Sequence, residues 1–346
     1  MRRALVVACA AVLALLDSCS SAPKAPEGVF ELRNKAAELA KLGDSLMARA
    51  EYAQALQYYE DALKADSSVD DLAGVAASHA SMGRAYLAAG EAEAAEREYQ
   101  DSLEYARLAA SGVAESKTAS VADSTAASAS ESAAEAGLGE VAFAGGAGVE
   151  ALRHFSKAVS LARAAGADKG GAADKALAVA LHDQAVAELA IGQTAQAMAD
   201  LGTAQAMNLK AKRWIELGAN RYTLASALSA AGREAEALTA ALGALEADKR
   251  AENSRALPAD LAAAAALCAK LGQEPEAWDY WRRSFDCALS ADDAASVRKA
   301  LTALVSTAAK LGKDDEGKRY ANLLAQLDQA EGKAGAAAPN ASVPAQ

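Results

Sequence analysis

The chain has 346 residues, a formal net charge of −11 at pH 7 and only 5% aromatic residues, and alanine is abundant. This acidic balance disfavours binding to nucleic-acid phosphates, since like charges repel. Alanine is the strongest helix former, and its small side chain lets helices approach closely. The composition therefore predicts helices packed over short distances rather than one large globular core.

Residues 1–18 have the pattern of a signal peptide. Arg2 and Arg3 precede a short apolar run over residues 4–16, which is below the ~20 residues that a membrane-spanning helix needs. The run ends in Leu-Asp-Ser-Cys and resembles the lipobox of bacterial lipoproteins. The resemblance implies that Cys19 is lipidated and that residues 19–30 form a flexible tether. Ordinary signal cleavage nearby is the alternative.

Two segments near the N-terminus repeat one pattern, with Gly43 and Gly83 at equivalent places. The first copy comprises Leu42, Gly43, Leu46, Tyr52, Ala53, Ala55, Tyr59, Ala62, Leu63 and Asp66. The second comprises Met82, Gly83, Tyr86, Gly90, Ala95, Tyr99 and Ser102. A looser third copy comprises Leu138, Gly139, Ala142, Gly146, Ala151, Phe155 and Ala158.

The C-terminal half contains the same device at a spacing of 40 residues. Four glycines each close an apolar helical stretch: Gly192, Gly232, Gly272 and Gly312. Each is followed five residues later by a small residue, namely Ala197, Ala237, Ala277 and Gly317. We expect the glycine to adopt the left-handed backbone that ends a helix. The small residue then lies where two antiparallel helices touch.

Together these copies resemble the tetratricopeptide repeat (TPR) family over roughly residues 31–331. The resemblance implies an all-α fold, a right-handed α-solenoid of about seven TPR-like hairpins, with a period of ~40 rather than the usual 34 residues. Hairpins 1 and 2 are expected within residues 31–112, and hairpins 3 to 7 within residues 132–331. A single hairpin cannot bury its apolar stripe, so neighbours must stack. An unrelated bundle of long alanine-rich helices is the alternative.

Three segments interrupt the repeats. Residues 113–131 are mostly Ser, Ala, Thr, Asp and Glu without an apolar stripe, so we predict a linker that divides the array into two rigid halves. Residues 166–174 are predicted to be a smaller Gly-rich mobile loop, and residues 332–346 a disordered tail.

No catalytic pattern is present among the usual reactive residues. His79, His154 and His182 are scattered, and no two have the i, i+4 spacing of a helical metal site. Cys268 and Cys287 have no nearby histidine, and the repeat register places them at different heights. We therefore expect buried free thiols, a disulfide being the alternative. The sequence predicts no enzyme, no metal and no cofactor.

The TPR resemblance implies that the first helix of each hairpin lines a concave wall. Its inward slots correspond to Ala40, Asp44, Ala80, Arg84, Ala136, Glu140, His182, Val186, Tyr222, Ser226, Ala262, Ala266, Thr302 and Ser306. These slots are small and mostly uncharged, which suits an apolar helix or segment of a protein partner. The candidate contacts on this wall are Tyr222, His182, Ser226, Arg84, Asp44 and Glu140. Solvated or paired surface charges are the alternative for Arg84 and Glu140.

Residues 278–283, Trp-Asp-Tyr-Trp-Arg-Arg, form a second candidate surface. Trp281 occupies the large core slot of its repeat, whereas Trp278 and Tyr280 point elsewhere around the helix. Trp, Tyr and Arg are enriched in binding hot spots, so Trp278 is a further candidate contact. Packing between neighbouring hairpins is the alternative.

These features favour a lipoprotein of the cell envelope, at the outer membrane and facing the periplasm. Its membrane contact is then the N-terminal lipid alone, because several acyl chains together make a stable anchor. We expect it to act as a scaffold that docks a protein partner in an assembly or transport complex. The alternative is a carrier that holds a small apolar ligand within the superhelix.

Overall fold

The computed structural model describes residues 28–115, 121–166 and 172–337. Within these ranges it contains 14 α-helices and no strand. The helices are α2 (Val29–Met47), α3 (Tyr52–Ser67), α4 (Leu72–Ala88), α5 (Ala92–Glu115), α6 (Val121–Ala144), α7 (Gly148–Ala164), α8 (Ala172–Ala190), α9 (Thr194–Lys210), α10 (Trp214–Ala230), α11 (Glu234–Arg250), α12 (Leu257–Lys270), α13 (Glu274–Ser290), α14 (Ala294–Leu311) and α15 (Asp314–Ala337). They pair in chain order into hairpins, which confirms the all-α TPR-like solenoid.

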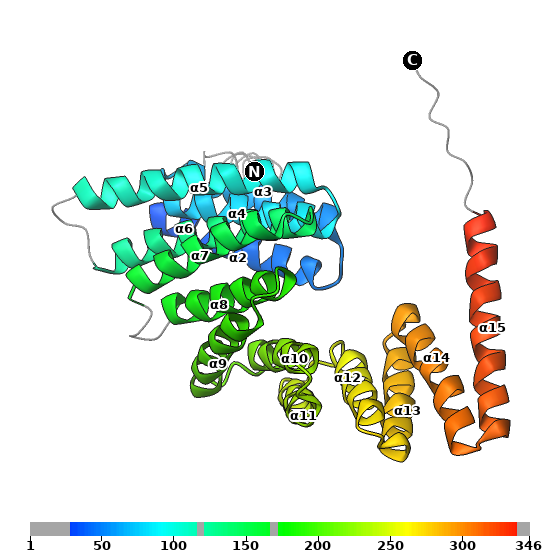
Figure 1. Cartoon of the computed structure of the whole chain (residues 1–346). Coiled ribbons are helices and arrows are strands. Elements are labelled where there is room, and N and C mark those ends of the chain that lie inside the picture. Colours follow the sequence, from blue (N-terminus) through cyan, green and yellow to red (C-terminus); the bar gives the residue numbers. More distant parts are fainter. Residues whose placement is uncertain (1–27, 116–120, 167–171, 338–346) are drawn as a thin grey trace, which may run out of the picture.

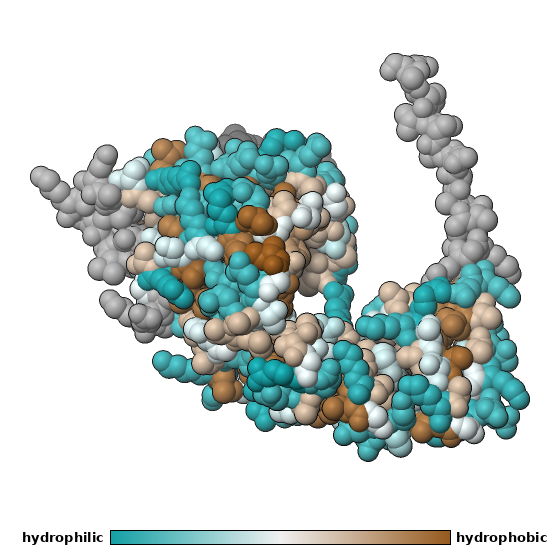
Figure 2. Space-filling model, viewed as in Figure 1, coloured by the Kyte–Doolittle hydropathy of each residue, from teal (hydrophilic) through white to brown (hydrophobic). Residues whose placement is uncertain are grey.

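The hairpins stack so that their first helices touch one another. In order, α2 contacts α4, α4 contacts α6, and the series continues through α8, α10 and α12 to α14. In the part of the chain that the structure describes, the backbones of the second helices do not approach one another in this way, although the rings of Trp278 on α13 and Tyr320 on α15 meet. The first helices therefore line an inner wall, and the second helices cover the outside. Figure 1 shows α2–α7 as a stacked block from which α8–α15 curve away. On the same face, hydrophobic residues lie among hydrophilic ones in both parts of the molecule (Figure 2).

The turn between the helices of each C-terminal hairpin has the predicted geometry. Gly192, Gly232, Gly272 and Gly312 have φ angles of 84°, 72°, 74° and 67°. An L side chain is strained in this left-handed region, whereas glycine is not. The alanines five residues after the first three glycines are fully buried. The repeat pattern was thus a correct guide to backbone and packing here.

The N-terminal hairpins pack aromatic rings directly on glycines. A Cβ atom added to Gly43 would lie 2.5 Å from the ring of Tyr59, and one added to Gly137 would lie 2.0 Å from the ring of Tyr99. Tyr99 also faces Gly83, at 3.0 Å from the same hypothetical atom. Each large ring therefore fills the space that a missing side chain leaves.

The prediction of a linker over residues 113–131 is wrong for most of that segment. Residues 113–115 end α5 and residues 121–131 begin α6, while residues 116–120 lie outside the described ranges. Ala127 and Ser132 of α6 are buried, and the Ser132 hydroxyl donates a hydrogen bond to the Ala158 carbonyl at 2.9 Å. Small side chains let this helix pack without a stripe of large apolar residues. Because α5 and α6 also contact each other, the array is not divided there.

A buried ion cluster also joins the hairpins across this segment. Glu135 of α6 is almost fully buried and accepts hydrogen bonds from His154 Nδ1 at 2.8 Å and Lys157 Nζ at 2.5 Å, both on α7. Arg107 of α5 lies 3.4 Å from the same carboxylate. Burial alone would raise the pKa of Glu135, but the Lys157 and His154 hydrogen bonds hold it below its usual value. The carboxylate therefore ties three helices together.

Two other predicted loops are shorter than expected. Helix α8 begins at Ala172, inside the predicted Gly-rich loop over residues 166–174, and residues 167–171 are outside the described ranges. Helix α15 continues to Ala337, into the predicted disordered tail, of which residues 338–346 are not described. The signal peptide, Cys19 and the tether through residue 27 also lie outside the described ranges.

The described helices contain no segment long and apolar enough to cross a membrane. Cys268 and Cys287 are free thiols, as expected. Cys268 is buried, and burial raises the pKa of its thiol. Cys287 is only half-buried, which corrects the expectation that both thiols are enclosed.

Candidate functional site

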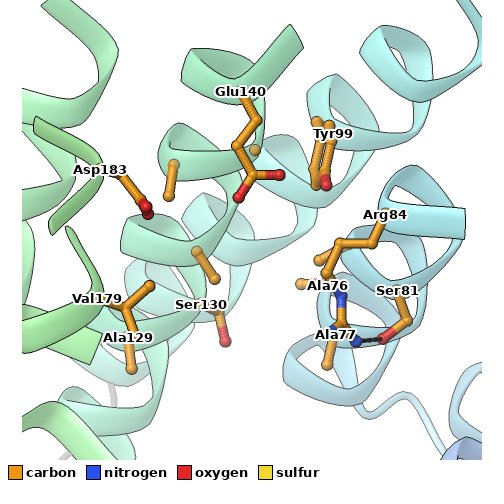
Figure 3. A pocket seen from close by; sticks show the side chains of 14 residues that line it. Ala76, Ala77, Ser81, Arg84, Tyr99, Ala129, Ser130, Glu140, Val179 and Asp183 are labelled. Atoms are coloured by element: carbon orange, nitrogen blue, oxygen red, sulfur yellow. Dashed lines mark hydrogen bonds between the residues drawn. The ribbon is translucent and has the colours of Figure 1, made fainter. Parts of the chain in front are cut away.

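The inner wall contains a cavity of about 420 Å³ between α4, α6 and α8. It is lined by Ala76, Ala77, Ala80, Ser81, Arg84, Tyr99, Ala129, Ser130, Ala133, Ala136, Gly137, Glu140, Val179 and Asp183. Figure 3 shows these side chains around the open space. Most of them are alanine or serine, so the volume arises because short side chains face each other across three helices. We call this space the first cavity.

Three charged groups face the first cavity. The carboxyl groups of Glu140 and Asp183 point toward each other from α6 and α8, and Arg84 lies across the cavity on α4 (Figure 3). Burial, together with the Glu140 charge, raises the pKa of Asp183 to about 8. Burial also raises the pKa of Glu140, which the Arg84 charge opposes. At neutral pH this pair of acids therefore retains a proton.

Two polar atoms of residues that line the first cavity have no hydrogen-bond partner within the described ranges. They are the Tyr99 hydroxyl and Asp183 Oδ2, and both are buried. A buried polar group without a partner costs about 1–3 kcal/mol. A ligand that supplied a donor or acceptor here would recover part of that cost. The first cavity thus combines an apolar lining with a few polar groups, as ligand sites commonly do.

The predicted contacts Asp44, Arg84 and Glu140 lie along this part of the wall. Arg84 and Glu140 both line the first cavity. Arg84 Nη2 also lies 3.3 Å from Asp44 Oδ1, which accepts a hydrogen bond from the Tyr59 hydroxyl at 2.8 Å. The paired-charge alternative therefore holds for Arg84 with Asp44. This pairing leaves the Arg84 guanidinium at the edge of the first cavity.

A second cavity of about 350 Å³ lies farther along the wall, between α8, α10, α12 and the end of α11. His182 and Tyr222, predicted separately, line it together. The Asn220 amide donates to His182 Nδ1 at 2.9 Å, and burial lowers the pKa of His182, so the imidazole is neutral. Ser226 is exposed and donates to the Tyr222 carbonyl at 3.3 Å. It is not among the residues that line this cavity.

Trp278 does not present an exposed contact. Its side chain is 4% exposed, and its ring meets that of Tyr320 edge-on at 5.7 Å. Lys313 Nζ lies over the other part of the ring, 4.7 Å from its centroid. The packing alternative therefore holds, and the proposal of Trp278 as a partner contact is corrected. The bulky ring joins α13 to α15.

Sequence reasoning predicted Glu140 but missed three other acids of the two cavities. Asp183 lines the first cavity, and its neighbour His182 lines the second. Adjacent residues on a helix point about 100° apart, so one short segment can serve two cavities. Asp248 and Asp260 line the second cavity, and neither was singled out. The signal that could have found them is their position in the repeat, since they lie 40 residues after Asn208 and Asn220, which are also polar and buried.

One group of metal-ligating residue types occurs among the described residues. His79, Glu98 and Asp101 each place a ligand atom within 4.8 Å of the others. His79 Nδ1 is 2.8 Å from Glu98 Oε2, and the imidazole stacks on Tyr105 at 5.4 Å. A hydrogen bond between α4 and α5, together with this ring stacking, accounts for the geometry.

Known proteins resemble the chain in structure. No family model matches it, and no curated protein matches its sequence. A TPR-sensor signal transduction ATPase of Pyrococcus horikoshii matches with a TM-score of 0.63 and 14% identity, over 86% of this chain and 42% of that one. A Rap protein complexed with competence and sporulation factor matches with a TM-score of 0.57 and 13% sequence identity, over 86% of this chain and 76% of that one. PilF of Pseudomonas aeruginosa matches with a TM-score of 0.52 and 16% sequence identity, over 73% of this chain and 91% of that one. At these identities the likeness shows the fold alone: the chain is a TPR-like solenoid.

Proposed function

We propose that this protein is a scaffold, anchored in the cell envelope by a lipid on Cys19, that docks a protein partner along the inner wall. The observation that supports docking best is the first cavity, because it opens on the helices that line the wall. Its lining of alanines with a few polar groups suits an apolar partner segment that also makes hydrogen bonds. The lipobox-like sequence supports the anchor.

The solved structures are consistent with this proposal in a limited way. One protein of similar fold was crystallised in complex with competence and sporulation factor, so that solenoid accommodates a second molecule. PilF shares the fold as well. We extend the idea of a bound partner, and not its identity, to this chain.

A pair of matched substitutions tests docking. Ala80→Phe places a ring in the first cavity from α4, whereas Ala235→Phe places the same ring on the exposed surface of α11. With envelope proteins captured on the purified chain, Ala80→Phe is expected to abolish recovery of the specific partner, and Ala235→Phe to leave it unchanged. Circular dichroism and melting temperature show whether both variants fold. Equal capture by two folded variants would mean that the partner docks elsewhere.

A second pair asks how far the contact extends along the wall. Tyr222→Ala removes the largest inward ring, and we expect it to weaken partner capture at least tenfold, about 1.4 kcal/mol. Ser226→Ala, one turn away and exposed, is the control. Arg84→Ala is expected to matter less than Tyr222→Ala, because Arg84 already pairs with Asp44.

The volume of the first cavity favours the carrier alternative. A volume of about 420 Å³ falls within the ~300–1,000 Å³ range of small-molecule sites. Mass spectrometry of the natively purified protein distinguishes the two functions. A stoichiometric small apolar molecule lost in Ala80→Phe supports the carrier, and its absence together with a captured protein supports the scaffold.

A further inference from the structure

Two buried acids line the second cavity. Asp248 lies near the end of α11 and Asp260 in the first turn of α12, and each is 2% exposed. Both are among the residues around the cavity of about 350 Å³. Removing a carboxylate from water costs several kcal/mol unless an opposite charge or hydrogen bonds replace the lost solvent. Two such groups in one small space therefore need partners.

The partners present satisfy the acids only in part. The Asn253 amide donates to Asp248 Oδ1 at 2.7 Å. The two carboxyl groups also hydrogen bond to each other, so they share a proton. Asp260 Oδ2 is buried and has no hydrogen-bond partner among the residues that the structure describes. One strong acceptor on the cavity lining is thus unused.

The remaining lining supplies no positive charge to the acids. None of the described residues around the second cavity is a lysine or an arginine, and its other titratable groups are His182 of α8 and Tyr222 of α10. His182 is neutral, with Nδ1 already bonded to Asn220. Arg221, next to Tyr222 on α10, donates to the Gly243 carbonyl instead. The lining of the cavity thus combines two acids with apolar side chains.

We propose that the second cavity binds a protonated primary amine on a short hydrocarbon chain. The ammonium group would donate to Asp260 Oδ2 and to the Asp248 carboxylate. Its hydrocarbon chain would lie along Ile215, Ala219 and the ring of Tyr222, which also line the cavity. A free diamine and a lysine side chain offer the same chemistry. The site does not depend on whether a protein docks along the wall.

Amine binding at this position must displace the shared proton. Burial and the neighbouring Asp248 charge raise the pKa of Asp260 to about 8. A cation beside the pair favours the ionised form and lowers that pKa. Binding at pH 7 is therefore accompanied by release of up to about one proton, and affinity rises as the pH approaches 8.

Calorimetric titration of the full-length protein in detergent tests the site. The probes are 1,5-diaminopentane and N-acetyl-lysine methylamide, with N-acetyl-norleucine methylamide as the uncharged control. Titration in two buffers of different protonation enthalpy measures the proton released. We expect at least one amine to bind tenfold or more tightly than the norleucine probe, with proton release. Binding of the diamine alone indicates a free amine, and binding of the lysine probe indicates a side chain.

Substitutions locate the site. Asp260→Asn keeps the volume and can donate to Asp248, so it is expected to fold and to lose amine binding at least tenfold. Asp248→Asn serves as the second variant with the same expected loss. Asp279→Asn changes the same charge at an exposed position of α13 and should bind as the unchanged protein does. Amine binding that matches norleucine, or that survives in both folded cavity variants, would overturn the proposal.

Discussion

A single methyl group at Gly137 tests how tightly the second and third hairpins are packed. A Cβ atom there would lie 2.0 Å from the ring of Tyr99, which is almost fully buried. Carbon atoms in contact prefer separations of about 3.5–4.0 Å, so the ring or the helix must move by about 1.5 Å. The ring cannot retreat freely, because Gly83 on α4 already holds it from another helix. Gly137→Ala is therefore expected to overpack this junction.

The magnitude follows from two opposing effects. Overpacking a core costs about 1–3 kcal/mol, and a clash as short as this belongs at the upper end. Replacing a helical glycine by alanine returns about 1 kcal/mol through backbone entropy. The expected net loss for Gly137→Ala is about 2 kcal/mol. Gly202 of α9 has nothing within 4 Å of its Cβ position, so Gly202→Ala should gain up to about 1 kcal/mol.

Urea unfolding followed by circular dichroism compares the two variants, and hydrogen exchange locates the change. Repeat proteins open by parts, so faster exchange should be confined to α5, α6 and their neighbours in Gly137→Ala. Equal stabilities for the two variants would refute the contact between Gly137 and Tyr99. Because both residues line the first cavity, the same variant should also weaken partner capture.

Three further predictions concern charge and anchoring. In urea unfolding, Glu135→Ala should cost about 2–3 kcal/mol, because it leaves the cations around this buried carboxylate without their partner. Glu150 forms an exposed pair with Arg153, so Glu150→Ala should change the stability by less than about 0.5 kcal/mol. Burial raises the pKa of Asp66 to about 6, of Glu188 to about 7 and of Asp260 to about 8. The stability that these groups contribute is full below about pH 4 and is lost as the pH rises through their folded pKa values, by up to about 1.4 kcal/mol per unit for each. Urea titrations should therefore show lower stability at pH 8 than at pH 5, and a rise would contradict the assignment. Cys19→Ser should move the protein from the membrane fraction to the soluble fraction. Unchanged partitioning would contradict the proposed lipidation of Cys19.

The repeat predicted the fold well where large and small residues alternate at fixed places. Gly232 and Gly272 have positive φ, and Ala237 and Ala277 are fully buried, because the same local geometry recurs in each hairpin. Helix α6 escaped prediction because its first turns contain no large apolar residue to reveal a stripe. It packs through alanine and serine, and the buried Ser132 hydroxyl bonds to the next helix. Close packing of this kind leaves little trace in a hydrophobic pattern.

The candidate site was predictable as a wall but not as cavities. Four of the predicted inward residues line cavities: Arg84 and Glu140 line the first, and His182 and Tyr222 line the second. The shape of a cavity, however, depends on where short side chains on three helices leave space between them. A list of inward positions does not describe that space. Tyr99 belongs to an outer helix, yet its ring reaches the first cavity because Gly137 leaves room for it.

The acids of the second cavity can be compared with their equivalents in neighbouring repeats. At the same junction one repeat earlier, Asn208 donates to Asn220 at 2.7 Å, and one repeat later the positions hold buried Ala288 and Ala300. At intervals of 40 residues, the equivalent pairs are Asn208 with Asn220, Asp248 with Asp260, and Ala288 with Ala300. An alanine pair closes the junction without polar groups, and an amide pair closes it with a hydrogen bond. The acid pair adds a buried charge, which neither of the other two pairs has, so packing alone does not require it. The amine that we propose for the second cavity offers a physical reason for this pair of acids, since an ammonium group would supply both a countercharge and hydrogen bonds.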